Sequence, residues 1–425
     1  MRMAISRRRF LKGASSAALL AELGLIRETA ARSVIRAPSE PASITGKAGW
    51  NDQYSLDPSV TYLNHGSIGT IPRVVQEAHS GYLSLCETNP WLYMWSEPWV
   101  EPREEVRRRA AALVNSDPEE LAITHNTTEC FNLLAGGLPL GAGDEVLFSS
   151  LNHLGASVCW YNQSVRRGYS VRQFDFPIDE IGLLNESDVV ARYEEAIGPN
   201  TRILVLPHVD NTVGLRHPVA QITSMARDKG VRWIVVDGAQ TASMIPVDLK
   251  ALGIDVYATS AHKWIQSPKE LGLAYIKEEV QTQIRPMWVT WGQNYWKDTV
   301  RIFEDYGTRA LPAVIALGDA LNFQTQLNEE ERERHHWQLW QNMQQIVDEN
   351  DNLFWRSPTS WNLSAALYAV EVRDKNGSDV AKSLFEEHGI VVRGFNTPAL
   401  NGIRISPNIA NDTNDLEKLV AAIGD

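Results

Sequence analysis

The chain has 425 residues, which is too long for one simple core and favours a large domain with a smaller one beside it. Its formal net charge of -12 argues against nucleic acid or an anionic membrane surface as a partner. The three cysteines, Cys86, Cys130 and Cys159, lack the number for a disulfide framework and the spacing of a metal site. We therefore expect small buried hydrophobes at these positions and no metal. No internal run is long and apolar enough to predict a membrane anchor.

The N-terminal segment, residues 1–33, has the composition of a targeting signal. Residues 6–12 read Ser-Arg-Arg-Arg-Phe-Leu-Lys, which resembles a twin-arginine export signal, and an apolar stretch and small residues follow. This pattern predicts export of the folded chain to a periplasm by the twin-arginine translocase. An ordinary basic N-terminus is the alternative. Residues 34–54, which contain prolines and a glycine, indicate a linker.

Short apolar runs in the middle of the chain predict buried parallel strands. Residues 233–237 end in a carboxylate, Asp237, and residues 256–259 lead directly to Ser260, His262 and Lys263. Ligands of open α/β sheets lie outside the carboxyl ends of the strands. Asp237 and Lys263 are therefore expected to converge on one pocket.

An amine and an acid in one pocket suit pyridoxal 5'-phosphate (PLP). The lysine forms a Schiff base with the cofactor aldehyde, and an acid at the pyridine nitrogen keeps the ring protonated as an electron sink. The spacing alone is equally compatible with a solvated surface lysine at Lys263 and a helix cap at Asp237.

Two adjoining motifs carry a family resemblance. Residues 236–240 read Val-Asp-Gly-Ala-Gln and residues 260–263 read Ser-Ala-His-Lys. The pair resembles the signature of class V aminotransferases, fold-type I PLP enzymes that include cysteine desulfurases and isopenicillin N epimerase. The resemblance covers roughly residues 55–420. It implies an α/β fold in which residues 55–305 form a large PLP-binding domain with a mostly parallel seven-stranded sheet, and residues 306–425 a smaller C-terminal α+β domain.

A strand end followed by a helix start predicts an anion site. Residues 123–129 read Ile-Thr-His-Asn-Thr-Thr-Glu, and free N–H groups at such a helix N-terminus favour a phosphate. Threonine at a helix N-terminus is common, so the pattern alone is weak. The resemblance assigns Thr127 and Thr128 to the cofactor phosphate, with Ser260 and His262 as further contacts.

The same resemblance assigns residues around the cofactor ring. It implies that His153 stacks on the pyridine ring and assists proton transfer, a task for which a flat imidazole titrating near neutral pH is suited. Asn211 and Gln240 are implied partners of the cofactor's phenolic oxygen. From the residues alone, a single histidine after a strand is more often structural.

Substrate contacts are predicted from two segments. Residues 402–406, Gly-Ile-Arg-Ile-Ser, resemble the family strand whose arginine, here Arg404, clamps a substrate carboxylate. Arg393 is a second, weaker candidate, and a surface arginine is the alternative. Asn64 and His65 lie in a loop that resembles the Asn-His-Gly-Ser start of isopenicillin N epimerase-like members, where it borders the substrate; a plain turn is the alternative.

The remaining expectations concern packing and assembly. Trp91, Trp95 and Trp99 recur every fourth residue, so we expect them to pack in the core, with an aromatic wall over the active site as the alternative. Residues 313–340 are helical by periodicity and charge. Thr308 follows a glycine in a segment that resembles the family's contact with the phosphate of a partner subunit, which implies a homodimer.

The resemblance predicts chemistry at the α-carbon of an amino acid or amino-acid-containing product, by transamination or epimerisation. Elimination by a PLP-dependent lyase uses the same residues and stays open. Desulfurases need a mobile cysteine shortly before the arginine strand, and residues 393–399 contain none, so we expect no desulfurase. Export suggests a periplasmic enzyme of secreted peptide or siderophore maturation. A non-catalytic binding protein on the same scaffold is the alternative from another class.

Overall fold

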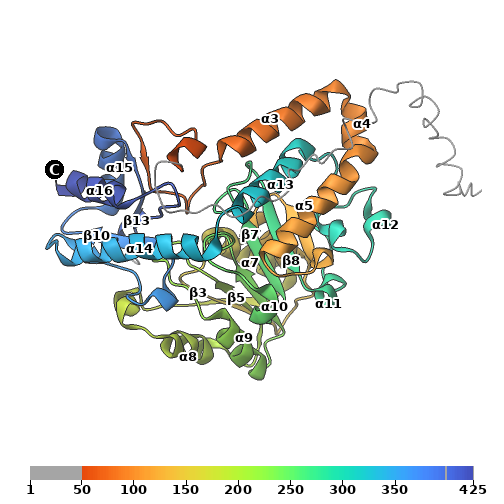
Figure 1. The fold of residues 1–425 in the computed structure, drawn as a ribbon. Helices are drawn as coiled ribbons and strands as arrows, with labels where there is room; N and C mark the ends of the chain where they lie inside the picture. Colours follow the sequence, from red (N-terminus) through yellow and green to blue (C-terminus); the bar gives the residue numbers. More distant parts are fainter. Residues whose placement is uncertain (1–49, 398–399, 425) are drawn as a thin grey trace, which may run out of the picture.

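The computed structural model describes residues 50–397 and 400–424, and a seven-stranded sheet forms its centre (Figure 1). The sheet has the order β2-β8-β7-β6-β5-β3-β4, and β8 alone runs antiparallel to its neighbours. The predicted mostly parallel seven-stranded sheet is therefore confirmed. Its strands are β2 (Leu121–Thr124), β3 (Glu145–Ser149), β4 (Ser170–Phe174), β5 (Thr201–Pro207), β6 (Trp233–Asp237), β7 (Val256–Ser260) and β8 (Gly272–Ile276).

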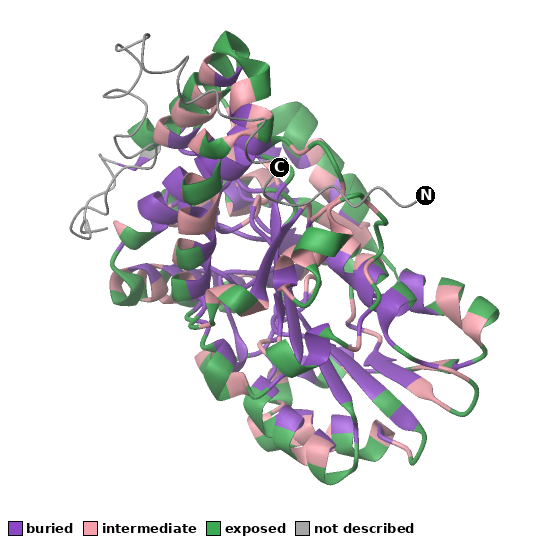
Figure 2. Ribbon diagram, turned by 90° about the vertical axis from the view of Figure 1, so that its right-hand side faces the viewer, coloured by how far each residue is buried: buried purple, intermediate pink, exposed green. Residues whose placement is uncertain are grey.

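Successive strand residues enter two different cores. In β5, Leu204 and Leu206 belong to one apolar cluster, while Ile203 and Val205 belong to the cluster on the opposite face. Helices cover both faces, so the central strands are almost entirely buried, whereas the edge strand β4 is partly exposed (Figure 2). The first cluster includes residues of α8 (Glu186–Ala196) and α9 (Val219–Asp228), and the second includes residues of α6 (Thr127–Gly137) and α7 (Leu154–Arg167).

The N-terminal helices pack around one buried helix. This helix, α13 (Leu311–Thr325), is apolar on all sides and contacts α3 (Arg73–Thr88) and α5 (Val100–Leu113). The sequence predicted one helical stretch over residues 313–340, but the structure divides it into α13 and α14 (Glu329–Asp348). The break follows from Asn328, whose side chain caps the new helix by accepting from the N–H of Glu331.

The C-terminal region forms a four-stranded antiparallel sheet with its own core. The sheet order is β12-β13-β10-β9, and α14 carries the chain into it (Figure 1). Its elements are β9 (Leu353–Trp355), β10 (Tyr368–Val372), α15 (Gly377–His388), β12 (Arg393–Asn396), β13 (Asn401–Ile405) and α16 (Thr413–Gly424). This is the predicted smaller α+β domain. A short parallel pair, β1 (Thr61–Tyr62) with β11 (Ile390–Val391), joins the start of the described chain to it.

The tryptophan spacing does not produce a core stripe. Helix α4 (Pro90–Trp95) leaves Trp91 and Trp95 exposed, at 74% and 60%, whereas Trp99 is buried. The prediction of core packing is wrong for the first two. The short helix ends at Trp95 and a 3₁₀ turn follows, so Trp99 no longer lies on the same face.

The predicted export signal, residues 1–33, and most of the predicted linker lie outside the described residues. Within residues 50–397 and 400–424, no helix combines the length and the apolar character needed to cross a membrane. All three cysteines are buried and unpaired, as the composition predicted.

Candidate active site

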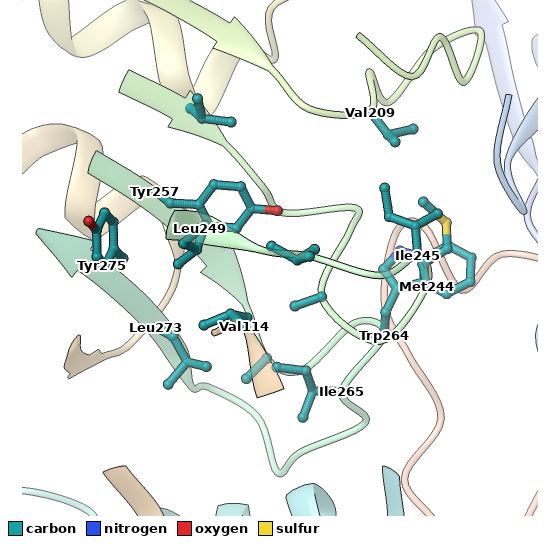
Figure 3. Packing of buried hydrophobic residues seen from close by; sticks show 14 of the residues in the cluster. Val114, Val209, Met244, Ile245, Leu249, Tyr257, Trp264, Ile265, Leu273 and Tyr275 are labelled. Carbon is teal, nitrogen blue, oxygen red and sulfur yellow. The ribbon is translucent and has the colours of Figure 1, made fainter. Parts of the chain in front are cut away.

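Lys263 is positioned by the buried strands beside it. Strands β6 and β7 are neighbours, and Asp237, the last residue of β6, pairs with Ala258. The turn after β7 is closed by the bond from the Lys263 N–H to the Ser260 carbonyl, 3.1 Å. Trp264, the next residue, is fully buried in the apolar cluster that also holds Met244 and Ile245 (Figure 3). Burial of this large ring fixes the backbone that carries the lysine.

The predicted residues line one cavity of about 590 Å³ between the large sheet and the small domain. Those predicted to hold the cofactor and carry out the chemistry are brought together as expected: Thr127, Thr128, His153, Asn211, Asp237, Gln240, Ser260, His262 and Lys263. Arg404, predicted to bind the substrate, lines the same cavity from the small domain. Asn64, His65 and Thr308 do not line it.

The amine of Lys263 is prepared to act as a nucleophile. Burial lowers its pKa, the carboxylate of Asp237 opposes this change and the charge of Arg404 adds to it, so that the pKa is about 8. A substantial fraction of the amine is therefore neutral near neutral pH. A neutral amine can attack an aldehyde, whereas an ammonium cannot.

Asp237 and His153 provide an acid and a flat ring in the same cavity. Burial raises the pKa of Asp237, while the backbone N–H of Ala239, 3.0 Å from its Oδ1, and the charges of His153 and Lys263 oppose the change. Burial lowers the pKa of His153, and its Nδ1 accepts from the N–H of Gly155 at 3.1 Å. Neutral His153 therefore carries its proton on Nε2.

The N-terminus of α6 forms the predicted anion site. The side chain of Asn126 accepts from the N–H of Glu129, 3.0 Å, and so starts the helix at Thr127. The hydroxyls of Thr127 and Ser260 lie 2.8 Å apart. His262 Nδ1 is buried with no hydrogen-bond partner in the described chain, and burial lowers the pKa of this ring to about 4. These donors suit a phosphate group.

A glycine that the sequence analysis missed keeps this site open. A Cβ at Gly155 would lie 2.7 Å from the hydroxyl of Thr128 and 3.0 Å from Nδ1 of His153. Any side chain would therefore push the anion site and the ring apart. The available signal was a glycine two residues after His153, in the first turn of the helix.

Arg404 is held by neutral acceptors. Its Nη1 donates to the carbonyl of Asn211 at 2.7 Å, and its Nη2 donates to Asn64 Oδ1 at 2.9 Å and to Ser67 Oγ at 2.7 Å. Its Nε is buried with no partner within the described residues. Burial and the charge of Arg393 lower the pKa of Arg404 to about 10, so the group stays charged at neutral pH.

The loop that carries Asn64 packs directly on the lysine turn. The N–H of Gly69 donates to the carbonyl of His262 at 3.0 Å, and a Cβ at Gly69 would lie 1.8 Å from the carbonyl oxygen of Lys263. Only glycine permits this approach. Asn64 therefore borders the cavity through Arg404 rather than by lining it.

Three other predicted residues have distinct surroundings. His65 is buried between Tyr62 and Trp264, and burial lowers its pKa to about 3. Gln240 lines the cavity, but its Nε2 donates to the carbonyl of Gly66 at 2.8 Å and its Oε1 accepts from Trp264 at 2.9 Å. Thr308 is exposed, so its predicted contact with a partner subunit stays a prediction.

The residues fit PLP. A nucleophilic amine, a buried acid, a flat imidazole and a helix N-terminus border one cavity, and these are the kinds of partner that the cofactor's aldehyde, ring nitrogen, ring face and phosphate would need. When bound, PLP supplies an aldehyde for amines and a ring that accepts electrons from the bonds at the substrate α-carbon.

Comparison with known proteins agrees with this geometry. The family model described as "Aminotransferase class-V" matches residues 61–419, so the chain belongs to the class V aminotransferase family and is a PLP-dependent enzyme. Isopenicillin N epimerase of Amycolatopsis lactamdurans is 30% identical over 411 residues, covering 89% of this chain and 98% of that protein. A probable cysteine desulfurase of Pseudomonas aeruginosa is 28% identical, covering 86% of this chain and 93% of that protein.

Solved structures give the same result for the fold and the cofactor. A cystine C–S lyase in complex with its reaction product, cysteine persulfide, has a TM-score of 0.79 and 26% identity, covering 87% of this chain and 98% of that one. A second structure, of a lysine-to-alanine variant, has a TM-score of 0.78 and 25% identity, covering 88% of this chain and 99% of that one. In that structure, glycine is covalently linked to the PLP cofactor. The fold-type I assignment and the cofactor are therefore established. The relatives carry out different reactions, so membership leaves the reaction open.

Proposed function

We propose that the protein acts at the α-carbon of an amino acid or amino-acid-containing product, by transamination or epimerisation. The observation that carries the proposal is the arrangement of Lys263, Asp237 and His153 around one cavity whose other wall presents Arg404. Arg404 binds the substrate carboxylate and so orients the α-carbon. Lys263, with a pKa of about 8, takes and returns the α-proton.

Epimerisation requires a proton to leave one side of the α-carbon and to return on the other. Lys263 and His153 both line the cavity, and both are groups that can take up and release a proton. The similarity to isopenicillin N epimerase over almost the whole chain supports this choice. Asp237 remains buried and balances the positive charge that forms on the ring nitrogen.

The first experiment tests whether Lys263 holds the cofactor. Borohydride reduction of the PLP-loaded protein followed by peptide mapping should label Lys263, and Lys263→Ala should be colourless. A yellow protein with an unlabelled Lys263 contradicts the proposal. A protein that binds no PLP at all supports the non-catalytic binding module instead.

The second experiment separates the reactions. Candidate amino acids are incubated with the PLP-loaded protein in deuterated water, and their mass and chirality are then measured. Epimerisation gives deuterium with an unchanged skeleton and mixed chirality, whereas transamination converts the cofactor to its amine form. Absence of exchange with every amino acid tested would contradict chemistry at the α-carbon.

A lyase that cleaves a C–S bond by elimination is the second candidate. The similarity to a cystine C–S lyase, with a TM-score of 0.79, favours it. The chain's cysteines are buried outside the cavity lining, so a desulfurase of this sequence has no cysteine there to accept sulfur. Formation of a keto product with the cofactor unchanged would identify the lyase.

We also propose export through the twin-arginine route and a homodimer. The first is supported by the Arg-Arg-Arg-Phe-Leu-Lys sequence of residues 7–12, and the second by the exposed Thr308 and the family resemblance. Replacing Arg7 and Arg8 by lysine should retain the protein in the cytoplasm, as measured by cell fractionation. Light scattering of the purified protein should give twice the chain mass.

A further inference from the structure

Two arginines reach the cavity from neighbouring strands of the small domain. Arg393 of β12 and Arg404 of β13 are directly opposite each other, so their side chains lie on the same face of the sheet. Phe395 lies two residues further along β12, on the same face. The guanidinium carbons of Arg393 and Arg404 lie 5.7 Å and 6.0 Å from the centre of its ring. All three side chains line the cavity.

Neither arginine forms an ion pair with an acid in the part of the chain that the structure describes. Strands β10, β12 and β13 contain one acidic residue, Glu371, and Arg356 binds its carboxylate at 2.7 Å. Asp210 lies behind Arg404, but its two oxygens accept from backbone N–H groups of residues 212, 213 and 215. Like charges directly opposite each other in a sheet are destabilising. The charge of Arg404 is therefore only partly balanced, by Asp210, and no acid is in contact with Arg393 within the described residues.

The two arginines differ in how they are held. Arg404 is buried and donates to three neutral acceptors, as the anchor of a substrate carboxylate requires. Arg393 is exposed, and in the part of the chain that the structure describes its guanidinium has no hydrogen-bond partner. Its donors are free to bind an anion that enters the cavity.

We propose that the substrate is an amino diacid whose second carboxylate, on its side chain, binds Arg393 while Arg404 binds the α-carboxylate. The inference rests on the proposed function and names its substrate class. The planar fork of arginine matches a carboxylate with two parallel hydrogen bonds. A second carboxylate would neutralise the remaining charge on this face of the small sheet.

The geometry places the two arginines close together. Directly opposite residues in a sheet have Cβ atoms about 5 Å apart. Both guanidinium groups also lie within 6.0 Å of the centre of one phenylalanine ring. The two guanidinium groups are therefore within reach of one amino diacid, such as glutamate or 2-aminoadipate.

The test compares diacids with neutral analogues of the same shape. The PLP-loaded protein is titrated with L-glutamate against L-glutamine, and with L-2-aminoadipate against L-norleucine, and binding is followed by the visible absorbance of the cofactor. We expect the wild type to prefer at least one diacid roughly tenfold to a hundredfold. Arg393→Gln should reduce that ratio to near one.

A matched control and a charge reversal sharpen the result. Arg373 directly follows β10 and lies over Phe354 of β9 at 4.8 Å. It is exposed and does not line the cavity, so Arg373→Gln should keep the wild-type ratio. Arg393→Glu should shift the preference toward amino acids with a side-chain amine, such as L-ornithine.

The outcomes separate this proposal from the one on which it depends. If Lys263 is labelled by borohydride but the wild type shows no preference for diacids, the proposed function stands and the diacid proposal is wrong. The same conclusion follows if Arg393→Gln and Arg373→Gln have equal ratios. If the protein binds no PLP, the proposed function itself fails.

Discussion

Two pairs of arginines in this molecule differ in how their positive charge is balanced. Arg107 and Arg309 share the buried carboxylate of Glu304, with N–O distances of 2.8 Å and 3.0 Å. Arg393 and Arg404 share the ring of Phe395 and form no ion pair with any of the described residues. The first pair is neutralised within the protein. The second leaves its charge to be neutralised by a ligand, which is how a binding site differs from a structural ion pair.

The largest effect is expected at Glu304. Glu304→Gln removes the buried acid that Arg309 and Arg107 share, although Arg107 keeps its bond to Glu104, so the free energy of unfolding should fall by about 3–5 kcal/mol. Denaturant unfolding measures this loss. Glu371→Gln, which breaks a partly exposed pair with Arg356, is the control and should cost about 1 kcal/mol or less. Equal losses in the two variants would contradict the distinction between the arginine pairs.

The ion pairs of Glu304 with Arg107 and Arg309 also predict that stability depends on pH. Burial opposes ionisation of Glu304, but Arg107 and Arg309 hold its pKa well below its usual value. This stabilisation is present above the unfolded glutamate pKa of about 4.3 and is lost as the pH falls below it. The difference in the free energy of unfolding between wild type and Glu304→Gln should therefore shrink as the pH falls from about 5 to about 3, a range that spans the unfolded pKa.

A smaller effect is expected at Arg404. Arg404→Gln removes a charged partner of the substrate carboxylate, so affinity for amino acids should fall by about 2–3 kcal/mol. Titration of the PLP-loaded variant, followed by the cofactor's absorbance, measures the change. The amount of PLP bound per chain serves as the control. If the variant loses PLP but keeps its affinity for amino acids, Arg404 binds the cofactor rather than the substrate.

The pH dependence of cofactor capture is a finer test. Only the neutral amine of Lys263 attacks the aldehyde, so the rate of PLP uptake by the apoprotein should rise with pH through a midpoint near 8. Arg404 lowers this pKa and Asp237 raises it. Arg404→Gln should therefore move the midpoint up, and Asp237→Asn should move it down. Stopped-flow absorbance measures the rate, and shifts in one common direction would contradict these charges' roles.

The smallest effect is expected for the stability of Arg393→Gln. Loss of the contact with Phe395 should be offset by relief of the repulsion from Arg404, so the free energy of unfolding should change by no more than about 0.5 kcal/mol. Denaturant midpoints compared with Arg373→Gln measure it. A loss similar to that of Glu304→Gln would make Arg393 a structural residue.

The cofactor side of the site was predictable because its signals are local. Asp237 ends an apolar run, Lys263 follows the next one, and parallel strands bring such ends to one edge. The α6 anion site also follows from a strand and a helix that adjoin in sequence. These signals need no knowledge of distant contacts.

The substrate side was only partly predictable because it depends on non-local register. Nothing in residues 393–404 fixes which residue of β12 lies opposite Arg404, yet a slip of one residue would turn Arg393 away from the cavity. The pairing of Arg107 with Glu304 likewise joins residues 197 positions apart. The failed tryptophan stripe has the same origin, since a short turn after Trp95 changed the face that Trp99 presents.

The loop from Asn64 to Gly69 spans the gap between the two halves of the site. Asn64 accepts a hydrogen bond from the guanidinium of Arg404, and Gly69 packs against the backbone of Lys263. The distance from the substrate's anchor to the reacting amine is thereby set by one short covalent tether. A lengthened tether should leave cofactor and anchor each intact while misaligning the α-carbon between them.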